Sequence, residues 1–154
     1  MQRLHPGAVV PARAHDGDAG MDLVSVEHCT LQPGERAVVG TGIAIEVPSG
    51  WAALACPRSG LAAQHGIGVV NGPGVVDAGY RGEVRVVLHN SDKVASFTIE
   101  PGDRIAQLVL TPVFTGAIVE VDELSTAARA ADGFGSTGGF AASTSVGHSP
   151  RSTS

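Results

Sequence analysis

Residues 83–90 read Glu-Val-Arg-Val-Val-Leu-His-Asn and carry the clearest strand pattern in the chain. Successive side chains of a β-strand point to opposite faces, so a period of two marks a strand with one buried face. Here one face would hold Val84, Val86 and Leu88, and the other would hold Glu83, Arg85, Val87 and His89. The run therefore predicts a half-buried strand.

Short apolar runs continue on both sides of this strand, separated by turn signals such as Pro-Gly-Glu at 33–35 and Asn-Gly-Pro-Gly at 71–74. They predict strands at 36–40, 43–47, 51–56, 67–70, 104–110 and 117–121. The only helix expected is a short one at 59–65, capped by Ser59. Many short strands about ten residues apart predict an all-β sandwich, jelly roll or barrel. Several runs are apolar on both faces, which suggests that a partner chain buries the second face.

The composition limits the function classes. A chain of 154 residues is long enough for one domain with its own core. Its net charge of −5 argues against a surface that coats nucleic acid. The cations are nine Arg and one Lys, and the guanidinium fork suits contact with phosphate. Cys29 and Cys56 lack metal-ligand spacing and are interpreted as buried free thiols. We see no signal peptide and no apolar run near ~18 residues, so we expect no membrane contact and a cytoplasmic location.

The C-terminal residues differ in composition from the rest. Seven of the fourteen residues at 141–154 are Ser or Thr. Such a stretch cannot bury enough apolar area to offset its ordering entropy, so a disordered tail is predicted there. Residues 1–128 are predicted to form the β domain, and the glycine-rich residues 129–140 a flexible arm.

Two segments in the first half contain residues suited to anions or cations. His-Asp-Gly-Asp at 15–18 precedes Ala-Gly-Met-Asp-Leu at 19–23, which invites a calcium-loop interpretation. The glycine positions and the missing terminal Glu argue against it and favour a simple turn. Pro-Arg-Ser-Gly-Leu at 57–61 opens the expected helix, where free N–H groups favour an anion near Arg58 and Ser59. The alternative is a capped turn with an exposed Arg.

A third segment, 71–83, combines four glycines with Asp77 and Tyr80. Its glycines would let a hairpin bring its backbone close to a flat ligand. Asp77 could serve as a general base, and Tyr80 offers a stacking surface. The alternative is a decorated hairpin in which Asp and Arg pair structurally.

Two further segments lie in the second half. In Gly-Asp-Arg-Ile-Ala-Gln-Leu-Val, 102–109, Gln107 interrupts an apolar strand, and its amide needs a phosphate or a backbone partner. Residues 129–139 resemble a phosphate-cradling loop, but they lack the Gly-Lys-Ser/Thr ending of a P-loop. The alternative for this last segment is a plain flexible tail.

In this order the five segments resemble the five signature motifs of the homotrimeric dUTP diphosphatase (dUTPase) family, spread over residues 19–138. The resemblance implies a jelly-roll subunit in a homotrimer with shared active sites. It implies hydrolysis of dUTP to dUMP and pyrophosphate, by Mg²⁺-assisted attack of water on the α-phosphorus. Mg²⁺ would be held mainly by the substrate phosphates.

The resemblance also implies roles for individual residues. Asp77 would activate the attacking water, and Asp22 would hold waters of the magnesium shell. Contacts with phosphate would come from Arg58, Ser59, Gly60, Gln107, Arg129, Ser136, Thr137 and Gly138, and Gly135 would also contact the substrate. Contacts with the nucleoside would come from Asn71, Val75, Val76, Tyr80 and Phe134, and Arg85 would lie near the ligand. Tyr80 would pack on deoxyribose and exclude a 2′-hydroxyl.

The fifth motif departs from the family pattern, because Ala130 and Asp132 stand where two glycines are usual. Asp adopts left-handed backbone more easily than Ala does, and an acid near the phosphates would weaken their binding. Two alternatives to the diphosphatase stay open at this point. One is a dCTP deaminase-like nucleotide enzyme, and the other is a non-catalytic β-sandwich interaction module.

Overall fold

The computed structural model describes residues 1–126. The predicted arm at 129–140 and tail at 141–154 lie outside the described residues, and so do six predicted site residues: Arg129, Phe134, Gly135, Ser136, Thr137 and Gly138. Their boundaries and roles stay predictions. Met1–Gly116 form one compact unit.

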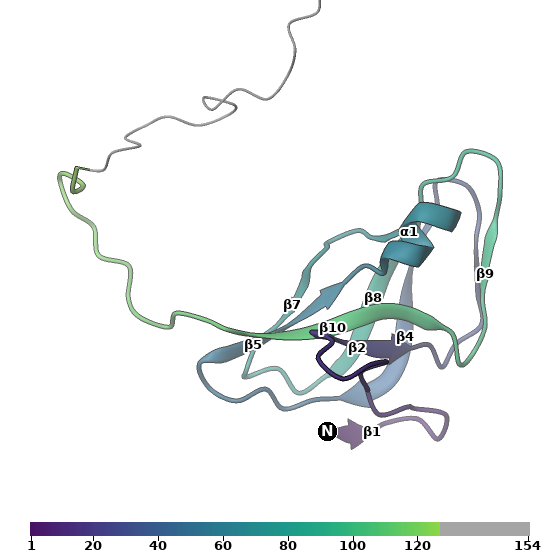
Figure 1. Cartoon of the computed structure of the whole chain (residues 1–154), viewed down its shortest axis with the longest axis horizontal. Helices are drawn as coiled ribbons and strands as arrows, with labels where there is room; N and C mark the ends of the chain where they lie inside the picture. Colours follow the sequence, from purple (N-terminus) through teal and green to yellow (C-terminus); the bar gives the residue numbers. More distant parts are fainter. Residues whose placement is uncertain (127–154) are drawn as a thin grey trace, which may run out of the picture. The chain divides into compact units, whose positions relative to one another are not determined.

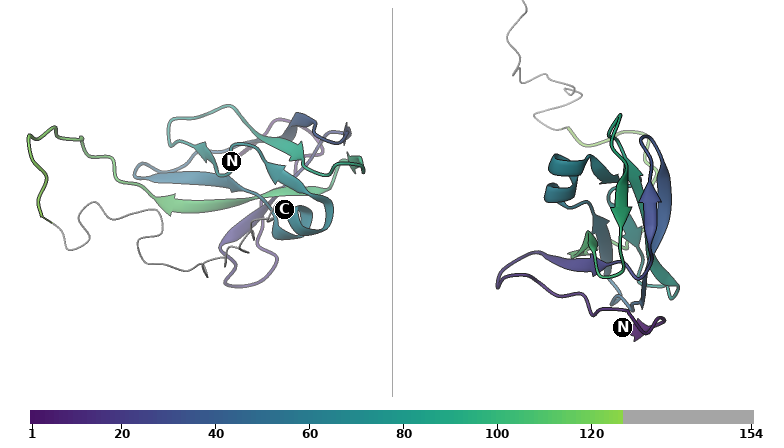
Figure 2. Two further views of the ribbon diagram at one scale, coloured as in Figure 1. Left: turned by 90° about the horizontal axis from the view of Figure 1, so that it is seen from above. Right: turned by 90° about the vertical axis from the view of Figure 1, so that its right-hand side faces the viewer.

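This unit is built from short antiparallel strands (Figure 1). Its strands are β1 (Gln2–Arg3), β2 (Gly20–Val24), β3 (Cys29–Leu31), β4 (Arg36–Ala44), β5 (Trp51–Cys56), β6 (Ile67–Val69), β7 (Gly74–Val76), β8 (Glu83–Asn90), β9 (Phe97–Ile99) and β10 (Arg104–Pro112), and its helix is α1 (Ser59–His65). One sheet has the order β1-β4-β8-β6 and another the order β2-β10-β5-β7, while β3 and β9 form a third, two-stranded sheet. Non-sequential neighbours such as β10 and β2 explain why distant sequence segments meet (Figure 2).

The core joins the two four-stranded sheets face to face. Val86 and Leu88 from β8 belong to the same buried cluster as Leu23 from β2 and Leu108 from β10. Burying each of these side chains contributes about 1.5–3 kcal/mol, which fixes the alternation of β8. The predicted faces of β8 are confirmed, since Val84, Val86 and Leu88 are at most 2% exposed. The all-β fold with one short helix is confirmed as well.

Helix α1 follows directly after β5. Its N-cap residue is Arg58 and no side chain caps it, so the prediction that Ser59 is the cap was wrong. The helix ends at Gly66, which has a left-handed φ of 65° and donates its N–H to the Ala62 carbonyl at 3.2 Å. A Cβ at Gly66 would lie only 2.9 Å from the Ser91 Oγ, so glycine is required there for two reasons. The helix thereby begins at a fixed position next to the end of β5.

Some predicted strands differ from those of the structure. The strand expected at 36–40 continues to Ala44 as β4, because Gly42 (φ 66°) lets the chain pass through a register shift opposite β8. The separate strand expected at 43–47 was wrong, since residues 45–47 lie outside any strand. The strand expected at 117–121 was wrong: no strand occurs among residues 117–126, and Ile118 is 99% exposed. An apolar run forms a strand only where a partner strand accepts its hydrogen bonds.

Two other expectations concern cysteines and membranes. Cys29 and Cys56 are free thiols as expected, but both are half-buried, not fully buried. Within residues 1–126 no helix has the length and apolarity needed to cross a membrane.

Candidate active site

Strand register brings the first, second and fourth sequence segments together. In the β2–β10 pairing Asp22 lies opposite Gln107, and in the β10–β5 pairing Gln107 lies opposite Cys56. Cys56 is the last residue of β5, so Arg58 follows two residues later at the same edge. These three neighbouring strands therefore deliver a carboxylate, an amide and a guanidinium to one place.

A cavity of about 330 Å³ lies at this place. It is lined by Ala14, Asp18, Ala19, Gly20, Asp22, Arg58, Ser59, Gly60, Arg104 and Gln107, and we call it the phosphate pocket. It contains five residues singled out from the sequence: Asp22, Arg58, Ser59, Gly60 and Gln107. Sequence reasoning had assigned no role to Arg104.

Asp22 is the electrostatic centre of the phosphate pocket. The Arg58 Nε lies 3.1 Å from Asp22 Oδ1, and the Arg104 Nη1 lies 3.1 Å from Asp22 Oδ2. The Asp22 side chain is only 20% exposed, so its charge is partly removed from water and gains from both partners. The Arg58 Nη1 also donates to the Arg104 carbonyl oxygen at 3.2 Å. Two guanidinium groups are thus held side by side in a sheltered cavity, an arrangement suited to an anion.

Gln107 forms the wall of the phosphate pocket between Gly20 and Pro57. Its Nε2 donates to the Pro57 carbonyl oxygen at 3.0 Å, so of the two partners considered from the sequence the backbone is present. A Cβ at Gly20 would overlap the Gln107 Oε1 and would lie 3.1 Å from its Cδ. Glycine at position 20 therefore leaves the amide of Gln107 room to face the cavity.

The third segment forms a separate hairpin around β7. Asn71, Val75 and Asp77 are exposed and Val76 is half-buried. A Cβ at Gly74 would lie 3.1 Å from the Asn71 Nδ2, so the amide of Asn71 lies directly over that glycine. The structure brings these residues together with one another, but none of them lines the phosphate pocket.

The turn after β7 is held by its backbone and by side chains other than that of Asp77, whose carbonyl accepts a hydrogen bond from the Tyr80 N–H at 3.0 Å. The Tyr80 Oη donates to the Glu83 carbonyl oxygen at 3.0 Å, and the Arg81 Nη1 donates to the Ala78 carbonyl at 2.6 Å. The Arg81 Nη2 pairs with Glu46 Oε1 at 2.8 Å, so the predicted alternative of an Asp–Arg pair within the hairpin is not present in the described residues. The exposed side chain of Asp77 takes part in none of these contacts.

The separation of Asp77 from the phosphate pocket can be estimated from the strand register. Val76 pairs with Ala53, so Asp77 follows at the level of Ala52, four residues along β5 from Cys56. At ~3.3 Å per residue and ~4.8 Å between strands, Asp77 is about 13 Å along and about 10 Å across from Gln107. Asp77 and the phosphate pocket of one chain cannot contact the same small group.

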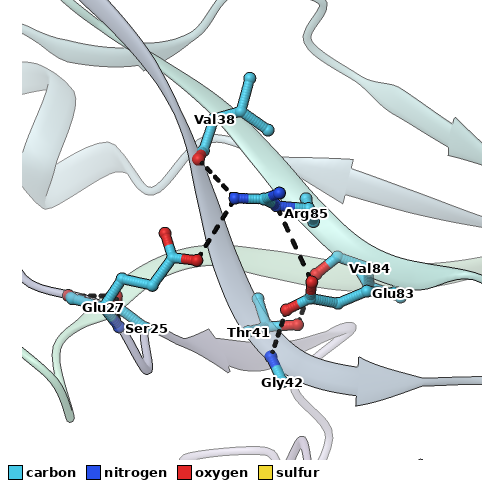
Figure 3. Close-up of polar contacts among 8 residues, drawn as sticks. All are labelled: Ser25, Glu27, Val38, Thr41, Gly42, Glu83, Val84 and Arg85. Atoms are coloured by element: carbon cyan, nitrogen blue, oxygen red, sulfur yellow. Dashed lines mark hydrogen bonds and ion pairs between the residues drawn. The ribbon is translucent and has the colours of Figure 1, made fainter. Parts of the chain in front are cut away.

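Arg85 lies on the other sheet, between two glutamates (Figure 3). Its Nη2 lies 3.3 Å from Glu27 Oε1 and donates to the Val38 carbonyl at 3.0 Å, while its Nε lies 3.8 Å from Glu83 Oε2. Figure 3 also shows Glu83 accepting a hydrogen bond from the Gly42 N–H. Within one chain Arg85 is therefore engaged with carboxylates, away from the phosphate pocket.

Comparison with known proteins gives one consistent result. The family model for dUTPase matches residues 7–138. A deoxyuridine 5′-triphosphate nucleotidohydrolase of Thermobifida fusca is 60% identical over 92% of this chain and 79% of its own length, and one of Nocardia farcinica is 53% identical over 94% and 87%.

Solved structures agree. The Staphylococcus bacteriophage 80alpha dUTPase with dUPNHPP superposes with a TM-score of 0.84 at 32% identity, covering 89% of this chain and 96% of that one. A mutant dUTPase from phage phi11 of S. aureus, solved with a structural Mg(II) ion, superposes with a TM-score of 0.75 at 28% identity, covering 81% and 97%.

Proposed function

Because the chain belongs to the dUTPase family and hydrolyses dUTP, we propose that its site residues are divided between neighbouring copies of the chain. The phosphate pocket of one copy binds the triphosphate, and the β7 hairpin of another supplies the base and reads the nucleoside. The observation that carries this proposal is the separation of Asp77 from the phosphate pocket within one chain.

On the phosphate side, Arg58, Ser59, Gly60 and Gln107 bind the triphosphate. Support comes from their common cavity and from the two adjacent guanidinium groups within it. Arg58 supplies charge, while Ser59 and the backbone at Gly60 supply neutral donors at the first turn of α1. Phosphoryl transfer depends chiefly on positioning and charge neutralisation, which these groups provide.

On the nucleoside side, Asp77 takes a proton from the water that attacks the α-phosphorus, and pyrophosphate leaves. Its exposed carboxylate in a turn held by the backbone and by other side chains supports this role. Asn71 and the backbone at Val75 and Val76 read uracil, and Tyr80 packs on the deoxyribose. The hydrogen bond from Tyr80 to Glu83 supports that role, because it fixes the ring next to the turn.

The shared site requires more than one copy of the chain, and we assign it to a homotrimer; exposed apolar side chains support association of copies. Val38 is 50% exposed, Val75 61% and Leu110 42%, and these residues lie on strands that already bury their other face. Exposed aliphatic residues on strands buried on their other face are consistent with surfaces covered by another chain. We further assign Arg129, Phe134, Gly135, Ser136 and Thr137 to closure over the bound nucleotide, and Arg85 to the neighbourhood of the ligand.

Mg²⁺ fits this pocket if the substrate holds it. Mg²⁺ keeps several waters and is bound through one or two carboxylates together with substrate phosphates. Asp22 and Asp18 both line the pocket, while no group of three or more His, Cys, Asp or Glu suited to a metal occurs among residues 1–126. Asp22 would hold waters of the magnesium shell, and the ion would supply charge neutralisation at the phosphates.

Mixing two inactive variants tests the shared site. D77N lacks the base and R58Q lacks the phosphate ligand, so trimers of either variant alone hydrolyse dUTP slowly. When the two are unfolded, mixed in equal amounts and refolded together, random assortment gives about one quarter of the sites both intact residues, one from each chain. Pyrophosphate release should recover to about that fraction.

The matched control mixes R58Q with the D77N/R58Q double variant, which can form no intact site. Activity that stays at the control level in the first mixture would mean that both residues act within one chain or that one of them has no role. Either result would overturn the division of the site.

A further inference from the structure

A β-bulge places Arg104 in the phosphate pocket. Arg104 pairs with Val24, and Ala106 pairs with Leu23, so Ile105 is an extra residue between two ordinary pairs. Ile105 and Ala106 are both buried, at 2% and 0% exposure. Since two successive residues point inward, Arg104 and Gln107 share the pocket face although they are three residues apart. Bulges often redirect a side chain in this way beside an active site.

The redirected guanidinium reaches a specific oxygen. Asp22 Oδ2 faces Arg104, and Asp22 Oδ1 faces Arg58, each at 3.1 Å. The Asp22 carboxylate therefore has two cationic partners, one on each oxygen. The backbone carbonyl of Arg104 also accepts a hydrogen bond from Arg58. Arg104 therefore contacts both Asp22 and Arg58, to which the proposed function gives separate roles.

Phosphate binding by Arg58 and the magnesium-shell role of Asp22 both require the ion pair between these two residues to open. Arg58 binds phosphate only after it leaves Asp22, and Asp22 holds water of the magnesium shell only after Oδ1 is released. Releasing a sheltered carboxylate from its only partner would be costly, because its charge would be left unpaired. A second guanidinium on Oδ2 removes this cost, since it keeps the carboxylate paired and oriented while Oδ1 turns to the ligand.

We propose that Arg104 is a positioning residue, which holds Asp22 in place while Arg58 transfers from Asp22 to the substrate phosphates. This inference rests on the proposed function, since it uses the tasks assigned there to Asp22 and Arg58. Arg104 acts through Asp22 and not through the nucleotide.

A double-mutant cycle on the full chain tests the inference. Calorimetry with the α,β-imido analogue of dUTP in Mg²⁺ gives Kd for the wild type, R104Q, D22N and the D22N/R104Q double variant. R104Q should raise Kd by about 10–100-fold, the usual effect of removing a residue that orients a ligand group. In the D22N background the same change should raise Kd by less than about twofold, because the group that Arg104 positions is already altered.

Two further variants keep the result interpretable. R104K keeps a donor and a charge, so it should restore most of the affinity. R36Q removes an equal charge from an exposed residue of β4 and should leave Kd unchanged. Melting temperatures of all variants separate lost binding from lost folding.

Three outcomes would overturn the inference. If R104Q binds like the wild type while D22N is impaired, Arg104 has no positioning role and the proposed function stands. If R104Q causes its full loss in the D22N background too, Arg104 contacts the phosphates directly. If D22N itself binds normally, the task proposed for Asp22 fails, and the inference fails with it.

Discussion

The phosphate pocket and the β7 hairpin use their acidic residues in opposite ways. In the phosphate pocket Asp22 is sheltered and paired with Arg58 and Arg104. In the hairpin Asp77 is exposed, and it takes part in none of the ion pairs among the described residues. The hairpin is stiff all the same, because Tyr80 and Arg81 bond to its backbone.

The two regions therefore differ in whether ion pairs hold their acidic residue in place. A pocket that must hold a highly charged group is organised by its own ion pairs, which the ligand then exchanges. The residue proposed as the base, Asp77, is instead left without a cationic partner in the ion pairs of residues 1–126, so its carboxylate is free to meet the attacking water. Under the proposed function, aspartate therefore serves binding in one region and proton transfer in the other.

The largest expected effect is at Asp77. D77N should slow dUTP hydrolysis by about 10²–10⁴-fold, the usual range for a lost general base, while the fold and the trimer stay intact. An exposed side chain outside the ion pairs contributes little to stability, so the melting temperature should not change. Steady-state pyrophosphate release and thermal melting measure the two quantities.

D16N is the matched control for D77N, because Asp16 is also exposed and lies in a turn with no assigned role. D16N should retain wild-type turnover. Near-normal turnover in D77N would remove this residue from the mechanism.

A smaller effect is expected at the sugar. Y80A should reduce discrimination between dUTP and UTP by about tenfold or more, because the ring proposed to exclude the 2′-hydroxyl is lost. G82A should reproduce part of this change, since a Cβ there would lie 2.5 Å from the Tyr80 Oη and 2.7 Å from its Cζ. The ratio of kcat/KM for the two substrates is the measurement.

G79A is the control, because a Cβ at Gly79 would meet nothing within 4 Å. If Y80A leaves the ratio unchanged, the sugar is recognised elsewhere. If G79A changes the ratio as much as G82A does, the effect belongs to the turn and not to the ring.

The sequence predicted what depends on local pattern. The alternation of 83–90 predicted both faces of β8, since burial of three aliphatic residues fixes that strand. The five ordered motifs predicted the family, and the comparisons decide for it over the deaminase-like enzyme and the non-catalytic module. Five residues that line the phosphate pocket, Asp22, Arg58, Ser59, Gly60 and Gln107, were singled out from the same motifs, whereas Arg104 was not.

Features that depend on pairing between distant strands could not be predicted. Arg104 and Gln107 are three residues apart, so regular alternation puts them on opposite faces. The extra residue at Ile105 becomes visible only in the pairing with β2. The run at 117–121 failed for a related reason: its apolar residues have the composition of a strand, but no strand among residues 1–126 pairs with it.

The smallest effect is expected at a third carboxylate, Asp92, which lies in the loop after β8 and can be compared with Asp22 and Asp77. Like Asp77 it is exposed, but like Asp22 it is fully engaged. Its Oδ1 accepts hydrogen bonds from the backbone N–H groups of Val94 at 2.8 Å and Ala95 at 2.9 Å. These bonds favour the charged form, so the amides of Ala95 and Val94 hold the pKa of Asp92 below its ordinary value of 3.8.

The direction of the pH dependence follows from this shift. A carboxylate whose pKa is lower in the folded state stabilises the fold above its unfolded pKa, and that contribution is lost as the pH falls through the folded value. D92N keeps the Oδ1 acceptor but not the charge, so it should be slightly less stable than the wild type at pH 7. The difference should disappear as the pH falls below 3.8.

D92A, which loses the acceptor too, should be less stable than D92N at neutral pH, and both should retain wild-type kcat. Denaturant unfolding across this pH range, with turnover measured at pH 7, tests all three statements. If the stability difference between D92N and the wild type stays constant with pH, the charge of Asp92 does not stabilise the fold. If kcat falls in either variant, the loop after β8 belongs to the active site, and the contrast between Asp77 and the hydrogen-bonded carboxylates fails.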